Sequence, residues 1–193
     1  LPNHVIYRPA DLKRFTGGKL AVFARGNGGC ADDGASQRQQ LAEIASYGYL
    51  VIAPGKGRSG PNAKVGAEPP RAPAPGERLP PPATSAADVK AGLDFALAEN
   101  TRAGSKYAKL IDRKAVAVGG FSCGGLQALS LAADPRISTL VVQNSGIFNS
   151  SAESIGGMKL SKDTLKTIHT PVLYLLGGPK DIAYANGSDD VKR

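Results

Sequence analysis

The chain has 193 residues, of which 41% are hydrophobic and 21% charged, so it can bury a core and is not a disordered chain. The formal net charge of +8 could attract nucleic acid, but only 6% of the residues are aromatic and Trp is absent. This composition offers little for base stacking, and we expect no nucleic-acid partner. Two cysteines are too few for a disulfide scaffold or a zinc cluster, and no apolar run approaches the length of a membrane span.

The length predicts a single domain covering residues 1–193. The chain opens with Leu1 rather than Met and shows no basic-then-apolar leader. We therefore expect either a signal peptide that was removed or a start inside a longer chain. Two Asn-x-Ser/Thr sequons, at Asn149 and Asn186, add slightly to the expectation of a secreted or extracellular protein.

Segments with strand and helix patterns alternate along the chain. In chain order, the patterns predict an edge strand at 4–8, a strand at 20–24, a helix at 36–47, a strand at 49–53, a helix at 85–100, a strand at 115–119, a helix at 124–133, and strands at 139–142 and 172–176. Most of these strands are continuous Val/Leu-rich runs, which are typical of strands buried on both faces of a parallel sheet. The predicted fold class is α/β, with a doubly wound, mostly parallel sheet and helices on both faces.

A Pro- and Gly-rich excursion at about 54–83 interrupts this alternation and holds nine of the fourteen prolines. It is either a lid over a site or a solvated loop. The excursion begins with Gly55-Lys56-Gly57-Arg58-Ser59-Gly60, which matches the G-x-G-x-x-G dinucleotide motif. That motif requires a helix at this point, and Pro61 with the prolines after it predicts none, so the pattern argues against a dinucleotide site.

The motif with the most specific chemistry is Gly120-Phe121-Ser122-Cys123-Gly124, which matches G-x-S-x-G. It lies between a predicted strand and a predicted helix, which is the context of a nucleophile elbow. The turn is so tight that the serine takes a strained backbone conformation, and glycines at 120 and 124 let neighbouring backbone approach. We therefore predict that Ser122 is a nucleophile exposed above the carboxyl ends of the strands, close to a helix N-terminus.

A glycine-rich loop, Arg25-Gly26-Asn27-Gly28-Gly29, follows the second predicted strand. In the elbow arrangement, an oxyanion hole combines the N–H of the residue after the nucleophile, here Cys123, with an N–H from such a loop. Asn27 or Gly28 would supply this other N–H. Cys30 ends the loop and should lie near Cys123. We predict a Cys30–Cys123 disulfide that clamps the two parts of the site, with two buried thiols as the alternative.

Asp181 lies in Gly177-Gly178-Pro179-Lys180-Asp181, just past the strand predicted at 172–176. A carboxylate that leaves the end of this strand can orient a catalytic histidine. Asp189 and Asp190, further along the chain, are weaker candidates for this role. Asp181 is therefore the predicted acid.

The general base is the missing part of this site. The chain contains only His4 and His169. His4 begins the first predicted strand, and His169 precedes the strand at 172–176, at its amino end. Neither position predicts contact with Ser122, and no histidine follows Asp181.

The elbow at 120–124, the loop at 26–29 and the run ending at Asp181 occur in the order that is typical of the α/β-hydrolase superfamily. From about residue 4 to residue 187 the chain resembles this superfamily and is similar to its dienelactone-hydrolase-like and secreted esterase- or lipase-like members. The resemblance implies a serine hydrolase that cleaves a small-molecule ester through a Ser-His-Asp triad and a covalent acyl-enzyme. It implies no metal or organic cofactor.

Members of the superfamily usually carry one more strand, the catalytic histidine and a final helix after the acid, and this sequence ends before them. We therefore expect a C-terminally incomplete fold, with the histidine beyond residue 193 in a missing segment or a companion chain. The alternative is a chain that lacks this histidine natively. Residual catalysis in a chain of that kind would come only from the oxyanion hole and from binding, far below the rate of a full triad. A separate alternative is a non-catalytic binding module that keeps the same fold and uses the pocket or the basic loop at 54–82 for a ligand.

Overall fold

The computed structural model describes residues 1–61, 63, 81–150, 158 and 160–193. Its main elements follow one another as β1 (His4–Tyr7), β2 (Leu20–Gly26), α1 (Arg38–Ser46), β3 (Tyr49–Pro54), α2 (Ala86–Glu99), β4 (Ile111–Phe121), α3 (Cys123–Ser130), β5 (Thr139–Gln143), β6 (Val172–Leu175) and α4 (Tyr184–Val191). Short 3-10 turns lie at Leu12–Phe15, Gly28–Cys30 and Lys162–Thr167. All nine predicted strands and helices are present, with ends that differ by a few residues.

The strands form one six-stranded sheet in the order β1-β3-β2-β4-β5-β6. The pairs from β3 through β6 are parallel, whereas β1 pairs with β3 in the antiparallel direction at one edge. The predictions of an edge strand at the start of the chain and of a mostly parallel sheet are therefore confirmed. Parallel strands bring their carboxyl ends to one edge of the sheet, and the loops that leave this edge carry the predicted site residues.

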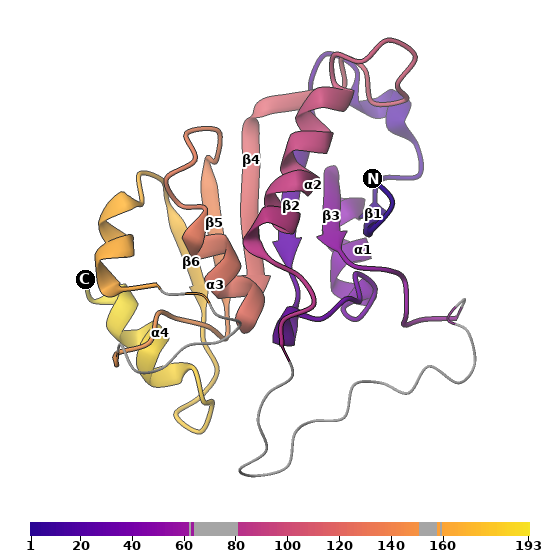
Figure 1. Cartoon of the computed structure of the whole chain (residues 1–193). Helices are drawn as coiled ribbons and strands as arrows, with labels where there is room; N and C mark the ends of the chain where they lie inside the picture. The colour runs from indigo at the N-terminus through magenta and orange to yellow at the C-terminus, as the bar shows by residue number, and fades with distance from the viewer. Residues whose placement is uncertain (62, 64–80, 151–157, 159) are drawn as a thin grey trace.

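Helices cover both faces of the sheet, as predicted. Figure 1 shows α2 and α3 in front of the sheet and α1 behind it. The larger core lies under α2 and α3 and is built from alternate residues of the central strands, such as Leu20, Val22 and Ala24 of β2. Phe23 points to the opposite face and packs with Leu41 of α1. The alternation of side chains along each strand thus sends successive residues into two separate cores.

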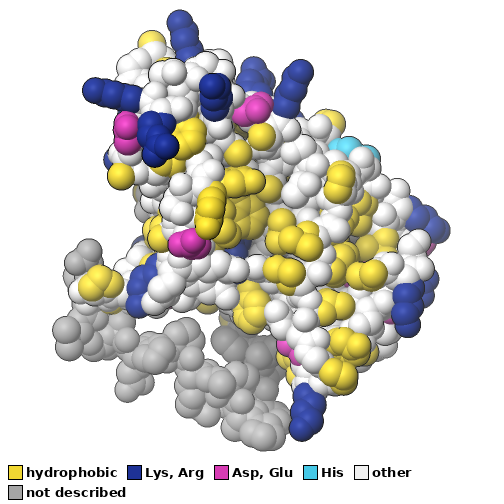
Figure 2. Space-filling model, turned by 180° about the vertical axis from the view of Figure 1, so that it is seen from behind, with side chains coloured by type: hydrophobic (Ala, Val, Ile, Leu, Met, Phe, Trp, Pro, Cys, Tyr) yellow, Lys and Arg dark blue, Asp and Glu magenta, His cyan; other side chains and the backbone are white. Residues whose placement is uncertain are grey.

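Strand β6 differs from the other strands because one of its faces is exposed. Leu173 and Leu175 keep 51% and 44% of their surface accessible, and Leu173 is paired in register with Val141 of β5, which belongs to the core on the α1 side. Figure 2 shows apolar side chains gathered on this side of the molecule. The prediction of strands buried on both faces therefore holds for the central strands and not for β6.

Helix α4 was not predicted, because Asn186 and Gly187 interrupt any helical pattern and are poor helix formers. Tertiary contacts hold it in place. The buried carboxylate of Asp190 accepts hydrogen bonds from Ile147 N at 2.8 Å and from Lys162 Nζ at 2.6 Å. The Tyr174 hydroxyl donates to the same carboxylate, and burial raises the pKa of Tyr174 well above its usual value. Asp190 is therefore occupied in anchoring α4 and the loop after β5.

Most of the excursion at 54–83 lies outside the described residues. Its first part, which matches the dinucleotide motif, contains no helix between Gly55 and Pro61, as the prolines predict. Two aspartates hold this part instead. Asp33 accepts hydrogen bonds from Arg58 N and Ser59 Oγ, and Asp32 forms an ion pair with the Arg58 guanidinium at 2.5 Å. In the described part of the chain, no helix is both long and apolar enough to cross a bilayer.

We expect Leu93→Ala to lower the free energy of unfolding by about 2–5 kcal/mol, since Leu93 has no exposed surface and its loss leaves a cavity beneath α2. Ile182→Ala is the matched control, because Ile182 is 91% exposed, and its effect should stay within about 0.5 kcal/mol. Urea unfolding followed by circular dichroism measures both values. Equal losses for the two variants would contradict the assigned core.

Candidate active site

Ser122 occupies a sharp turn between β4 and α3. Its backbone has φ 52° and ψ −119°, a left-handed conformation that a serine rarely adopts. The residue is half-buried, and Cys123 immediately after it is the first residue of α3. This arrangement has the geometry of a nucleophile elbow, with the serine at the carboxyl edge of the sheet and a helix N-terminus directly behind it.

Glycines make this turn sterically feasible. A Cβ added at Gly120 would overlap the peptide group of Gly124, and a Cβ at Gly124 would overlap the carbonyl group of Gly26. The same added Cβ would stand only 2.7 Å from Asn27 N. The backbones of β2, β4 and α3 therefore touch one another directly, and the first turn of α3 borders the loop that follows β2.

This loop brings Asn27 and Gly28, the other residues of the predicted oxyanion hole, beside the turn at Ser122; we call this junction of the loop and the turn the corner. Asn27 is buried, and its side-chain amide donates to Pro54 O at 2.7 Å and to Ala31 O at 2.9 Å, so the side chain is committed to holding the loop. A Cβ at Gly28 would stand 2.6 Å from the ring of Phe121, which packs against the loop. The backbone of Asn27 and Gly28 thus lies beside the elbow in a fixed conformation.

The predicted disulfide is present. Cys30 and Cys123 are bonded with their Cα atoms 5.4 Å apart, and both residues are buried. One cysteine ends the loop after β2, and the other follows Ser122. The bond therefore fixes the distance between the two backbone segments that form the corner, and the alternative of two buried thiols is wrong.

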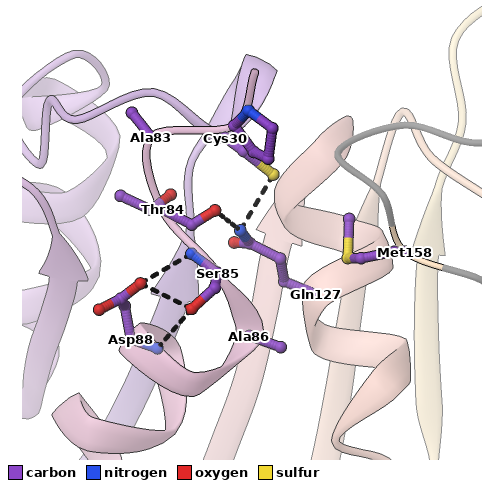
Figure 3. Close-up of a pocket in the computed structure, with 9 residues that line it drawn as sticks. Cys30, Ala83, Thr84, Ser85, Ala86, Asp88, Gln127 and Met158 are labelled. Atoms are coloured by element: carbon purple, nitrogen blue, oxygen red, sulfur yellow. Dashed lines mark hydrogen bonds between the residues drawn. The ribbon is translucent and has the colours of Figure 1, made fainter.

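A small cavity of about 160 Å³ lies beside the disulfide, at the N-terminal end of α2 (Figure 3). Gln127 of α3 forms part of its wall and donates from Nε2 to Thr84 O at 2.8 Å and to Cys30 Sγ at 2.9 Å. Met158 lies on the opposite side of Cys30 and Gln127 from Asp88 in this view. Ser122 does not line this cavity, so the cavity is separate from the predicted nucleophile.

Asp181 lies in the loop between β6 and α4, two strands from Ser122. Its carboxylate accepts hydrogen bonds from Asn144 Nδ2 at 2.7 Å and from Ala183 N at 2.7 Å. The hydrogen bond from Asn144 lowers the pKa of Asp181, and the one from Ala183 acts in the same direction. Gly177 leaves room for this pair, since a Cβ there would stand 2.8 Å from Asp181 Oδ2.

Asn144 connects the acid to the serine through the end of β5. The backbone N–H of Ser122 donates to Gln143 O at 2.9 Å, and Asn144 is the next residue, itself at φ 43°. Asp181 is thus hydrogen-bonded to Asn144, which is next in the chain to Gln143, the residue that binds the Ser122 backbone. Sequence reasoning missed both Gln143 and Asn144, although polar residues directly after a buried strand were a signal for this edge.

Neither histidine belongs to this site. His4 lies three strands away from β4, roughly 14 Å across the sheet, and its Nε2 donates to Asp88 O at 2.8 Å. His169 is exposed and lies just before β6, at the amino end of the sheet, about 15 Å from the carboxyl edge along a strand. The described residues therefore bring Ser122, the loop after β2 and Asp181 to one edge. His4 is also at this edge, paired with Pro54 at the end of β3, but it is three strands away from the strand that carries Ser122.

Comparison with solved structures agrees with this architecture. A crystal structure from Klebsiella pneumoniae subsp. pneumoniae, of a protein provisionally called a dienelactone hydrolase, matches 98% of the chain and 72% of its own length. The TM-score is 0.64 and the sequence identity is 20%. The chain therefore has the α/β-hydrolase fold, as its sequence predicts. No protein-family model matches the sequence, and no curated protein does.

Removal of the disulfide should destabilise the protein strongly, because the bond closes a loop with a sequence separation of 93 residues. We expect the double variant Cys30→Ala/Cys123→Ala to lose roughly 4.7 kcal/mol of unfolding free energy. Urea unfolding of the wild type with and without a reductant provides the comparison, and the double variant, which should not respond to the reductant, is the control. A wild-type midpoint that reductant leaves unchanged would argue against this role.

Asn144→Gly should raise the pKa of Asp181 toward its usual value, because the main stabilising hydrogen bond to the carboxylate is lost. Glycine adopts a positive φ without strain, so the substitution should not disturb the backbone at this position. A lowered folded-state pKa stabilises the protein above the unfolded pKa, near 3.9, and this stabilisation disappears as pH falls through the folded value. Carboxyl NMR titration measures the shift. Asn3→Gly, at an exposed position, should leave the Asp181 titration unchanged.

Proposed function

We propose that this protein is a serine hydrolase that cleaves an ester or related acyl bond of a small molecule. The observation that carries the proposal is the left-handed backbone of Ser122 at a strand–helix turn, with glycine backbones packed around it. Such strain persists only where the surrounding structure enforces it, and in a nucleophile elbow this conformation serves to expose the serine hydroxyl above the sheet. The α/β-hydrolase fold supports the proposal, because it is a common scaffold for this chemistry.

In the proposed reaction, Ser122 Oγ attacks the acyl carbonyl carbon while a histidine accepts the hydroxyl proton. The carbonyl oxygen becomes an oxyanion, which accepts hydrogen bonds from the N–H of Cys123 and the N–H of Asn27 or Gly28. The bond to the alcohol breaks, and the histidine returns the proton to the leaving oxygen. Water then attacks the acyl-serine by the same route and releases the acid and free Ser122.

Asp181 holds the histidine in this scheme. Its two oxygens each accept one hydrogen bond within the loop, so each keeps a lone pair for an imidazole N–H. Asp181 is ionised at neutral pH, and the hydrogen bond from Asn144 lowers its pKa further; an ionised acceptor stabilises the imidazolium that forms. Because His4 and His169 lie far from Ser122, we propose that the histidine comes from outside residues 1–193, in a further segment or a companion chain.

The disulfide between the loop and the elbow favours a secreted protein, since such bonds persist in oxidising compartments. The reaction requires a small-molecule ester and, in this scheme, no metal or organic cofactor. A second candidate function is a non-catalytic binding module with the same fold. The observation that favours it is the distance of both histidines from Ser122.

Reaction with a fluorophosphonate probe separates these two functions, because the probe forms a covalent bond with an activated serine. We expect the intact protein to be labelled on Ser122, as identified by peptide mass spectrometry. Ser122→Ala should abolish labelling, and Asp181→Asn should slow it about 1,000- to 10,000-fold through loss of histidine orientation. Ser46→Ala, at an exposed position on α1, is the matched serine control and should react at the wild-type rate.

Absence of labelling of the intact protein under these conditions would favour the binding module. Labelling that survives Ser122→Ala would place the reactive group elsewhere and would contradict the proposal. Hydrolysis of 4-nitrophenyl esters by the same set of variants provides an independent measurement of activity.

A further inference from the structure

Arg25 is a buried cation that sequence reasoning did not single out as a functional residue. It is the penultimate residue of β2 and has no exposed surface. Its Nη2 donates to Gln143 Oε1 at 2.9 Å and, more weakly, to Gln40 Oε1 at 3.4 Å, whereas Nε and Nη1 have no partner among the described residues. Burial lowers the pKa of Arg25 to about 10, so the side chain is charged at neutral pH.

None of the ion pairs among the described residues includes Arg25. A buried charge without a carboxylate partner destabilises a fold, and an apolar side chain of similar size would often be the more stable choice. The contacts of Arg25 must therefore explain its presence, and the strongest of these contacts is the one with Gln143.

The Arg25–Gln143 hydrogen bond joins two strands that are not neighbours. Strand β4 lies between β2 and β5, and Arg25 is paired in register with Gly119 of β4. Gly119 has no side chain, so nothing from this position stands between Arg25 and β5. A Cβ at Gly119 would lie 2.9 Å from the ring of Phe23, which places this crossing on the α1 side of the sheet. The side chain of Arg25 is thus a brace across β4.

Gln143, the residue that Arg25 reaches on β5, also binds the backbone of Ser122. Gln143 O accepts the N–H of Ser122 at 2.9 Å, and Asn144, the next residue, donates to Asp181. Arg25 itself precedes Gly26, the last residue of β2, and the loop that contains Asn27 follows directly. A single buried side chain therefore connects the loop after β2 with the strand end that holds both the elbow and the acid.

We propose that Arg25 is a positioning residue for Ser122, which fixes the serine backbone through Gln143 from the α1 side of the sheet. The disulfide fixes the same corner from the α3 side, so the elbow is braced on two faces. The effect on reactivity rests on the proposed function, whereas the effect on the Ser122 backbone does not. A small displacement at a reacting serine is enough to reduce its rate about 100-fold.

The test uses the intact protein with Arg25→Met, Gln143→Leu and the double variant. Hydrogen exchange followed by mass spectrometry reports the opening of the backbone at 120–126, and fluorophosphonate labelling reports the reactivity of Ser122. In each single variant we expect exchange in this segment, relative to the rest of the chain, to become at least about tenfold faster, with labelling about 10- to 100-fold slower. Because the two residues act as one unit, the double variant should be no worse than either single variant.

Arg25→Lys is the conservative variant, since a lysine can still donate to Gln143, and it should restore labelling to within about fivefold of the wild type. Arg113→Met is the matched control, because Arg113 is an exposed arginine on β4, and it should change neither measurement. If the wild type is not labelled, the proposed function fails, and the exchange measurement still decides whether Arg25 positions Ser122.

Wild-type exchange at 120–126 in folded Arg25→Met would overturn the proposal. So would additive losses in the double variant, because they would show that Arg25 and Gln143 act separately. If Arg25→Met does not fold, the double variant provides the same test, because it removes the buried charge and its hydrogen-bond partner together. Failure of both variants to fold would assign Arg25 to stability alone and would also overturn the proposal.

Discussion

Direct contact between three backbone segments is the constraint on which the rest of the site depends. Gly26, Gly120 and Gly124 allow β2, β4 and the start of α3 to meet at distances that no side chain would permit. This contact forces the chain at Ser122 into a left-handed conformation and places the loop after β2 beside the helix N-terminus. The serine and the neighbouring backbone amides are therefore held in place by packing within the protein itself.

The two braces across this corner differ in chemistry and in position. The disulfide is covalent, restricts the unfolded chain and is buried beside the side-chain amide of Gln127. The Arg25–Gln143 pair is polar, weakens the fold by burying a charge, and acts only in the folded state. The turn at Ser122 is therefore supported by two interactions of different chemistry, one on each face of the sheet.

The sequence was sufficient for the features that depend on local patterns. The order of strands and helices, the elbow at Ser122 and the proximity of Cys30 to Cys123 follow from short motifs and from where parallel strands end. Contacts between distant side chains were not predictable in this way. Asn144 meets Asp181, and Arg25 meets Gln143, only because β5 lies beside both β4 and β6. Helix α4 was not predicted because its local helix propensity is weak, and the tertiary contacts of Asp190 that stabilise it cannot be seen in the sequence.

Both ends of the long proline-rich excursion are fastened to the loop after β2. Asn27 binds the carbonyl of Pro54 on one side, while the N–H groups of Ala83 and Thr84 both donate to Cys30 O on the other. The insertion therefore starts and finishes at a common anchor, and the entropy of closing it changes only slowly with its length. The length and sequence of this excursion can therefore be changed with little effect on the backbone framework to which its two ends are attached.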